Sequence, residues 1–124
     1  MASRPILTPF PVITNGNMAS SITSIITITQ MLSMISYDIS WTGTSPVGVI
    51  SVQSSNTYAT DASGKVINAG QWSTLPLSVT PTVSGNSGNG FIDIDASAGY
   101  AIRLVYTPTS GTGTLNVTVA GKVQ

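Results

Sequence analysis

Two aspartates, Asp93 and Asp95, are the only closely spaced carboxylates in this 124-residue chain. On a strand, a spacing of two residues puts both side chains on one face. There they could act as paired catalytic carboxylates or hold calcium. Few other groups could carry chemistry, because the chain has no histidine, no cysteine and no glutamate. The usual catalytic triads and zinc sites cannot be built from it, so we expect no catalytic residue, no metal site and no cofactor.

A structural role for the two aspartates is the favoured interpretation. If their strand lies beside the one that follows residue 100, Arg103 stands opposite an aspartate on the outer face and forms a cross-strand ion pair. The segment DASGK, residues 61–65, also suggests an ion-binding loop. It lacks the glycine spacing of a phosphate-binding loop and the acidic positions of an EF-hand, so we expect a turn at Gly64.

Charge is unusually sparse on this chain. Charged residues make up 6% of it, against roughly 25% in typical soluble domains, and the net charge is zero. The four cations are scattered along the sequence, whereas a nucleic-acid binder needs them clustered. The sequence is expected to contain neither a signal peptide nor a membrane-spanning segment. We therefore expect no direct nucleic-acid or membrane partner, and a surface with little electrostatic protection against self-association.

Hydrophobic residues alternate with polar ones over most of the chain, which is the pattern of half-buried strands. The candidate core positions are Ile35, Tyr37, Ile39, Trp41, Ile50, Val52, Ile92, Ile94, Ile102, Leu104, Tyr106, Leu115, Val117 and Val119. The loop 108–113 is expected to reverse the chain and close a hairpin. The pattern predicts an all-β fold, a single antiparallel β-sandwich of seven or eight strands with jelly-roll character, over residues 19–124.

The first 18 residues are predicted to form an extended arm outside this sandwich. Three prolines lie in it, and proline fixes φ and removes a donor from a strand ladder. Its apolar side chains could dock on a neighbouring subunit. They are Ile6, Leu7, Phe10, Val12 and Ile13.

Tyr58 and Trp72 flank a long polar segment, residues 56–71, and are the candidates for ligand contact. Exposed aromatic rings can stack on the CH faces of sugars, so these two could form a carbohydrate site. The other interpretation is that both rings pack beneath the polar segment, as large apolar side chains usually do. Trp41 continues an alternating inward face and is assigned to the core.

Two family resemblances rest on the strings "ISWTGTSPVGVISVQSSN", "QWSTLPLSV", "GFIDI" and "YAIRLVYTPTSGTGTLNVTVAGK". Over residues 39–122 the chain resembles small proteins encoded in tailed-phage and related genomes. More loosely, it is similar to the second half of discoidin (F5/8 type C) domains, which are jelly-roll binding modules. It is shorter than those domains and lacks their disulfide-linked termini, so no binding residue can be transferred.

The phage resemblance implies a non-enzymatic structural protein of a phage or virus-like particle, in its capsid, decoration or tail. Such a protein would assemble with itself and with other virion proteins in the host cytoplasm, and would reside in the virion. The alternative function is a carbohydrate- or receptor-binding jelly-roll module that contacts its ligand through Tyr58 and Trp72.

Overall fold

The computed structural model describes residues 6–28, 34–76, 82–95 and 101–122, and all regular structure in these ranges is strand. The strands are β1 (Ile6–Asn17), β2 (Ile22–Thr23), β3 (Thr27–Ile28), β4 (Met34–Ser55), β5 (Ala59–Thr60), β6 (Val66–Asn68), β7 (Ser73–Thr74), β8 (Thr82–Val83), β9 (Ser87–Asp95) and β10 (Ala101–Lys122). Every pairing between them is antiparallel. The predicted all-β antiparallel sandwich is confirmed.

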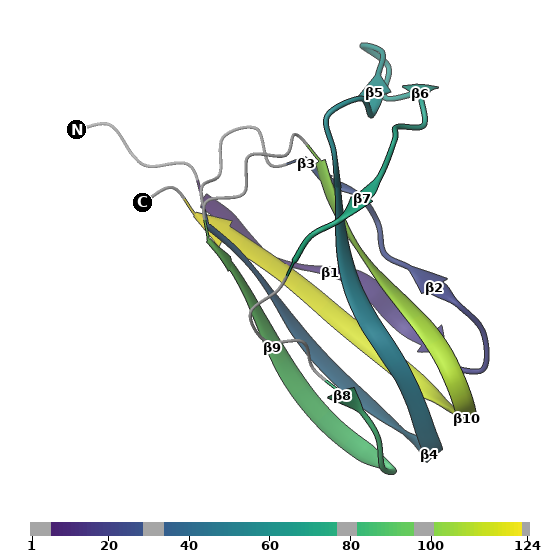
Figure 1. Cartoon of the computed structure of the whole chain (residues 1–124). Helices are drawn as coiled ribbons and strands as arrows, with labels where there is room; N and C mark the ends of the chain where they lie inside the picture. Colours follow the sequence, from purple (N-terminus) through teal and green to yellow (C-terminus); the bar gives the residue numbers. More distant parts are fainter. Residues whose placement is uncertain (1–5, 29–33, 77–81, 96–100, 123–124) are drawn as a thin grey trace.

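A long ribbon made of β4 and β10 organises the fold. Each strand has 22 residues, and they pair from Ala101 opposite Ser55 to Lys122 opposite Met34. Figure 1 shows that this ribbon bends back at one end, so that the first and second halves of each strand meet at a corner and run from it toward the opposite end of the molecule. The bend turns one continuous sheet into the two layers of a sandwich.

The bend coincides with one left-handed residue in each strand. Ser45 in β4 has φ 47° and Gly111 in β10 has φ 82°, and the pairing register is irregular at this corner. An extra residue in a strand reverses which positions face inward. Accordingly, the buried positions of β4 change from odd numbers, ending at Trp41, to even numbers, as at Ile50.

The first layer has the strand order β1, β10, β4, β9, and it uses the second half of β10 and the first half of β4. The second layer uses the remaining halves of the ribbon. There the two-residue strands β2 and β3 flank β10, and the equally short β7 and β8 flank β4. A separate small hairpin of β5 and β6 stands at one end of the sandwich (Figure 1).

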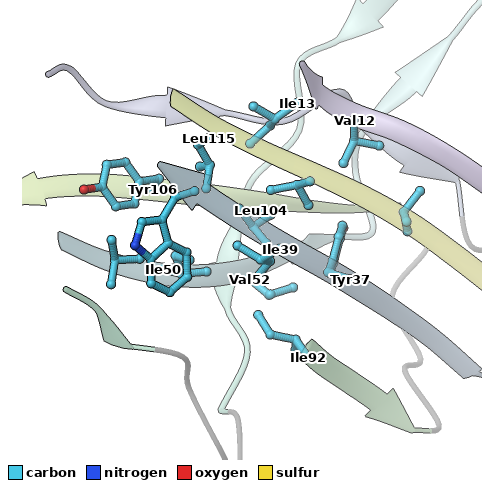
Figure 2. Close-up of a cluster of buried hydrophobic side chains, with 14 of the residues drawn as sticks. Val12, Ile13, Tyr37, Ile39, Ile50, Val52, Ile92, Leu104, Tyr106 and Leu115 are labelled. Atoms are coloured by element: carbon cyan, nitrogen blue, oxygen red, sulfur yellow. The ribbon is translucent and has the colours of Figure 1, made fainter. Parts of the chain in front are cut away.

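The core lies between the layers and is lined by the inward positions of both (Figure 2). All of the alternating residues predicted for it are buried. The structure adds Met18 and Val83, which are fully buried although no strand pattern marks them. Each large apolar side chain buried in this way contributes on the order of 1.5–3 kcal/mol, which favours the bent ribbon over an open one.

The predicted N-terminal arm is a strand of the sandwich. From Ile6 to Asn17, β1 pairs with the second half of β10, with three register shifts along the way. One shift falls between Pro11 and Ile13, and both Val12 and Ile13 point into this chain's own core (Figure 2). The prediction that these two side chains dock on a neighbour is therefore wrong, because proline tolerates an edge position and the bulge turns both inward.

The predicted closing hairpin is also wrong. Residues 101–107 and 114–122 do not pair with each other, because each half of β10 pairs with a different half of β4. The segment 108–113 forms the corner of the ribbon, not a tight reversal between partner strands.

Within the described ranges, no helix is long and apolar enough to cross a bilayer.

Candidate functional site

A row of polar side chains crosses the outer face of the second layer. Arg103 of β10 stands opposite Gln53 of β4, and Gln53 stands opposite Thr74 of β7. The Nε of Arg103 donates a hydrogen bond to Oε1 of Gln53, at 2.8 Å. The guanidinium group is therefore held against the sheet by its cross-strand neighbour.

Trp72 and Tyr58 complete what we call the Arg103 cluster, which consists of Gln53, Tyr58, Trp72 and Arg103. The guanidinium carbon of Arg103 lies 4.2 Å from the centroid of the Trp72 ring, which is cation–π geometry. The rings of Tyr58 and Trp72 are 6.0 Å apart between centroids and are tilted by 49°. All four side chains are partly exposed, so the cluster is accessible to a ligand.

Local hydrogen bonds fix the polar segment that presents the two rings. The Ser55 hydroxyl accepts from the backbone N–H groups of Thr57 and Tyr58, both at 3.2 Å. Across the segment, the Gln71 N–H donates to the Thr57 hydroxyl at 2.6 Å. The indole N–H of Trp72 donates to a backbone oxygen within the same segment, that of Ala69, at 2.9 Å. These bonds tie the Trp72 ring and the backbone of Tyr58 to the segment beside Arg103.

Burial is the only cause that lowers the pKa of Arg103 from its ordinary value, because desolvation disfavours the charged guanidinium. No carboxylate in the described part of the chain counteracts it. The predicted ion pair with Asp93 is wrong, because β9 lies in the first layer and Arg103 in the second. The side chain of Asp95, the other predicted partner, lies outside the described residues. A partly buried cation with no anion beside it among the described residues can accept one from a ligand.

The segment 61–65 is a turn, as predicted. Oδ1 of Asp61 accepts hydrogen bonds from the backbone and hydroxyl of Ser63, at 2.9 and 2.6 Å, and from the Lys65 N–H at 3.0 Å. These bonds hold the pKa of Asp61 below its ordinary value. Gly64 has φ 90°. The carboxylate is thus engaged by its own turn, which connects β5 to β6.

The other predicted contact residues lie on β1. Phe10 is 51% exposed, and it borders an apolar groove of about 240 Å³ that is also lined by Val12, Ile25 and Ile28. Ile6 and Leu7 pair through their backbones with Lys122 and Gly121. Their side chains lie outside the described residues. Of the five predicted contact residues, Phe10 is the one whose side chain is seen at the surface.

Asp93 is exposed on β9, and no group of three His, Cys, Asp or Glu side chains in the described ranges is placed to hold a metal ion. Inside the core, the hydroxyls of Tyr37 and Tyr106 and the indole N–H of Trp41 have no hydrogen-bond partner among the described residues. Burial raises the pKa of Tyr37 well above 10.0. The phenol therefore stays protonated at neutral pH.

Sequence reasoning identified Tyr58 and Trp72 but missed Gln53 and Arg103 as their neighbours. A signal was available, since Arg103 and Gln53 both fall on the polar side of their strands' alternation. The sequence did not show that Arg103 and Gln53 lie in the same layer as Trp72, because this depends on where the ribbon bends.

The chain matches no protein-family model, and no curated protein is significantly similar to it in sequence. Among solved structures it is similar to the SPBc2 prophage-derived protein YomS, with a TM-score of 0.50 and 17% sequence identity. The similarity covers 97% of this chain and 96% of that one. At this identity it concerns the fold, which the two proteins share over nearly their full lengths.

Proposed function

We propose that this chain is a non-enzymatic structural protein of a phage or virus-like particle, which assembles with copies of itself and with other virion proteins. The observation that carries the proposal is the exposure of two aromatic rings on the strands that end the first layer. Phe10 on β1 is 51% exposed and Phe91 on β9 is 60% exposed. Large apolar side chains at sheet margins mark contact surfaces, and a net charge of zero adds no repulsion between subunits.

The phage assignment draws on two kinds of likeness. The strand and turn strings of residues 39–122 resemble proteins of tailed-phage genomes, and the fold is similar to that of a prophage-derived protein. Both likenesses extend over most of the chain. The corresponding location is the virion, after assembly in the host cytoplasm.

Sedimentation velocity over a concentration series tests self-assembly, and electron microscopy of the same samples shows whether rings or shells form. We expect the mean mass to rise with concentration. Deleting the first 17 residues is unsuitable as a probe, because it would remove β1 and uncover the core. A substitution at the surface, Phe10→Ser, should instead weaken assembly.

Ile67→Ser is the matched control for Phe10→Ser. Ile67 is 66% exposed but lies on β6, in the small hairpin apart from both layers. It should leave assembly unchanged. A wild-type protein that remains monomeric at its highest soluble concentration would contradict the proposed function.

The Arg103 cluster favours a second candidate function, the binding of carbohydrate or of a glycosylated receptor. Trp72 and Tyr58 offer aromatic surface, and Arg103 is a cation without a carboxylate partner in the described structure. This combination suits a sugar that bears a carboxylate, since the guanidinium can pair with the acid while a ring stacks on the sugar.

Glycan-array binding, followed by titration with glucuronate and glucose, tests this candidate. We expect glucuronate to bind more tightly than glucose, and Trp72→Ala to abolish binding while the circular dichroism spectrum is unchanged. Arg103→Gln should remove the preference for the acid. A blank array, or equal binding of both sugars, would count against a site at the cluster.

A further inference from the structure

We propose that the edge of β9 pairs with β9 of a second copy of this chain, in an antiparallel register centred on Phe91. The inference rests on the proposed function, because it names one of the surfaces through which subunits assemble. In the described structure, β9 pairs on one side with β4. Figure 1 shows it at the margin of the sandwich.

β9 is the one described margin that has no proline, no bulge and more than a few residues. Proteins blunt sheet edges with prolines, bulges or very short strands. β1 contains Pro9 and Pro11 and three register shifts, and the margins of the second layer are two-residue strands. In contrast, β9 has nine residues, contains no proline and follows β4 without a shift in register.

Phe91 lies at the middle of this strand and faces away from the core, with 60% of its surface exposed. The residue opposite Phe91 on β4 is Asp38, which is also exposed and offers no apolar contact. In a register centred on Phe91, the two phenylalanines of a dimer stand opposite each other. Each ring would then be covered by its counterpart, as cross-strand aromatic pairs are.

The residues around Phe91 complement themselves in this register. Asn89 of one copy stands opposite Asp93 of the other, so an amide donor meets a carboxylate twice in each dimer. Both side chains are exposed on the same outer face as Phe91. A register centred on Asp93 would instead place like charges opposite each other, which is destabilising.

The inner face is compatible with the same register. There Gly90 stands opposite Ile92 of the other copy, and Gly88 stands opposite Ile94. Gly88 has no side chain, and its backbone lies against the Trp41 ring of its own chain. Small residues therefore meet large ones at both positions, which avoids crowding along the new edge.

Cysteine cross-linking tests the register directly, because the natural chain contains no cysteine. Directly opposite residues in an antiparallel pair have Cα atoms about 4.5–5.5 Å apart, within the range of a disulfide. Phe91→Cys should therefore give a covalent dimer on a non-reducing gel after mild oxidation. Asn89→Cys and Asp93→Cys, each tested alone, should give no covalent dimer. In the proposed register the two identical cysteines are offset by four positions, roughly 13 Å, which is too far for a disulfide.

A mixture of the Asn89→Cys and Asp93→Cys proteins should cross-link, and this arm retains Phe91. Cross-linking of either one alone as efficiently as the mixture would overturn the register.

Charge provides an independent test of the same register. Asn89→Asp places two carboxylates opposite each other twice in the dimer, and should weaken association at least about tenfold at low salt. The double variant Asn89→Asp with Asp93→Asn should restore it.

Sedimentation of the wild-type protein separates the two possible failures. A wild-type oligomer whose Phe91→Cys and mixed-cysteine forms do not cross-link would overturn the β9 contact and leave self-assembly standing. A wild-type monomer at every concentration would overturn both. Circular dichroism of each variant identifies any loss of folding, and the exposed Asn89 and Asp93 positions give variants that do not disturb the core.

Discussion

Replacing Gly111 by alanine should test whether the bend of the β4 and β10 ribbon holds the sandwich together. Gly111 has φ 82°, a region that residues with a Cβ rarely adopt. A Cβ built there would collide with the backbone of Ser45 on the partner strand, first with its carbonyl oxygen and also with its carbonyl carbon at 2.6 Å. Neither atom can rotate away, so the corner itself must shift.

The expected cost has two parts. The left-handed conformation costs about 1–2 kcal/mol for a non-glycine residue, and forcing an extra methyl into a packed site adds about 1–3 kcal/mol. The free energy of unfolding should therefore fall by about 2–5 kcal/mol. With an unfolding entropy of about 2.1 cal/mol/K per residue over 124 residues, each kcal/mol lowers Tm by roughly 4 °C, so we expect a decrease of roughly 8–20 °C.

Gly64 and Gly85 are matched controls for the conformational part. Their φ angles are 90° and 82°, but a Cβ at Gly64 meets nothing within 4 Å and one at Gly85 meets its nearest neighbour at 4.0 Å. Alanine at either position should cost about 1–2 kcal/mol, or roughly 4–8 °C in Tm. Thermal unfolding followed by circular dichroism measures all three variants. Equal losses at Gly111 and Gly64 would refute the steric role of the corner.

Three further predictions concern polar groups on either side of the sheets. Tyr37→Phe should raise the free energy of unfolding by about 1 kcal/mol, because it removes a buried hydroxyl without a partner; urea unfolding checks this. Burial raises the pKa of Tyr37 in the folded state, so above about pH 10 the phenol ionises in the unfolded chain first. The free energy of unfolding of the wild type is therefore unaffected by this group below about pH 10, and above it should fall more steeply with pH than that of Tyr37→Phe. Arg103→Gln should change the fluorescence of Trp72, which stacks on the guanidinium, and Trp72→Phe should abolish that change; an unchanged spectrum would contradict the stacking.

The residue pattern was sufficient to predict the class of fold and most of its core. Alternation such as Ile35, Tyr37, Ile39 and Trp41 has a period of two, which on its own assigns one face to the interior. The turn at Gly64 was equally local, because it depends on an aspartate that bonds to backbone within four residues. Such features need no knowledge of the distant chain.

The candidate site was predicted only in part, because some of its contacts are local in sequence and others are not. Tyr58 and Trp72 are both anchored by bonds inside one segment, so their proximity follows from local sequence. Their contact with Arg103 spans the sheet and depends on which half of β10 lies beside β4 and β7. No local pattern distinguishes that half from the other.

Alternation and composition act residue by residue, so they were enough to specify an all-β, sparsely charged chain with a defined set of buried positions. In contrast, long-range packing places residues 101–107 and 114–122 in different layers and makes residues 6–17 a strand of the first layer. The bend at Ser45 and Gly111 produces this arrangement. It separates Arg103 from Asp93 and leaves β9 at the margin, since the core closes only when the ribbon folds over itself.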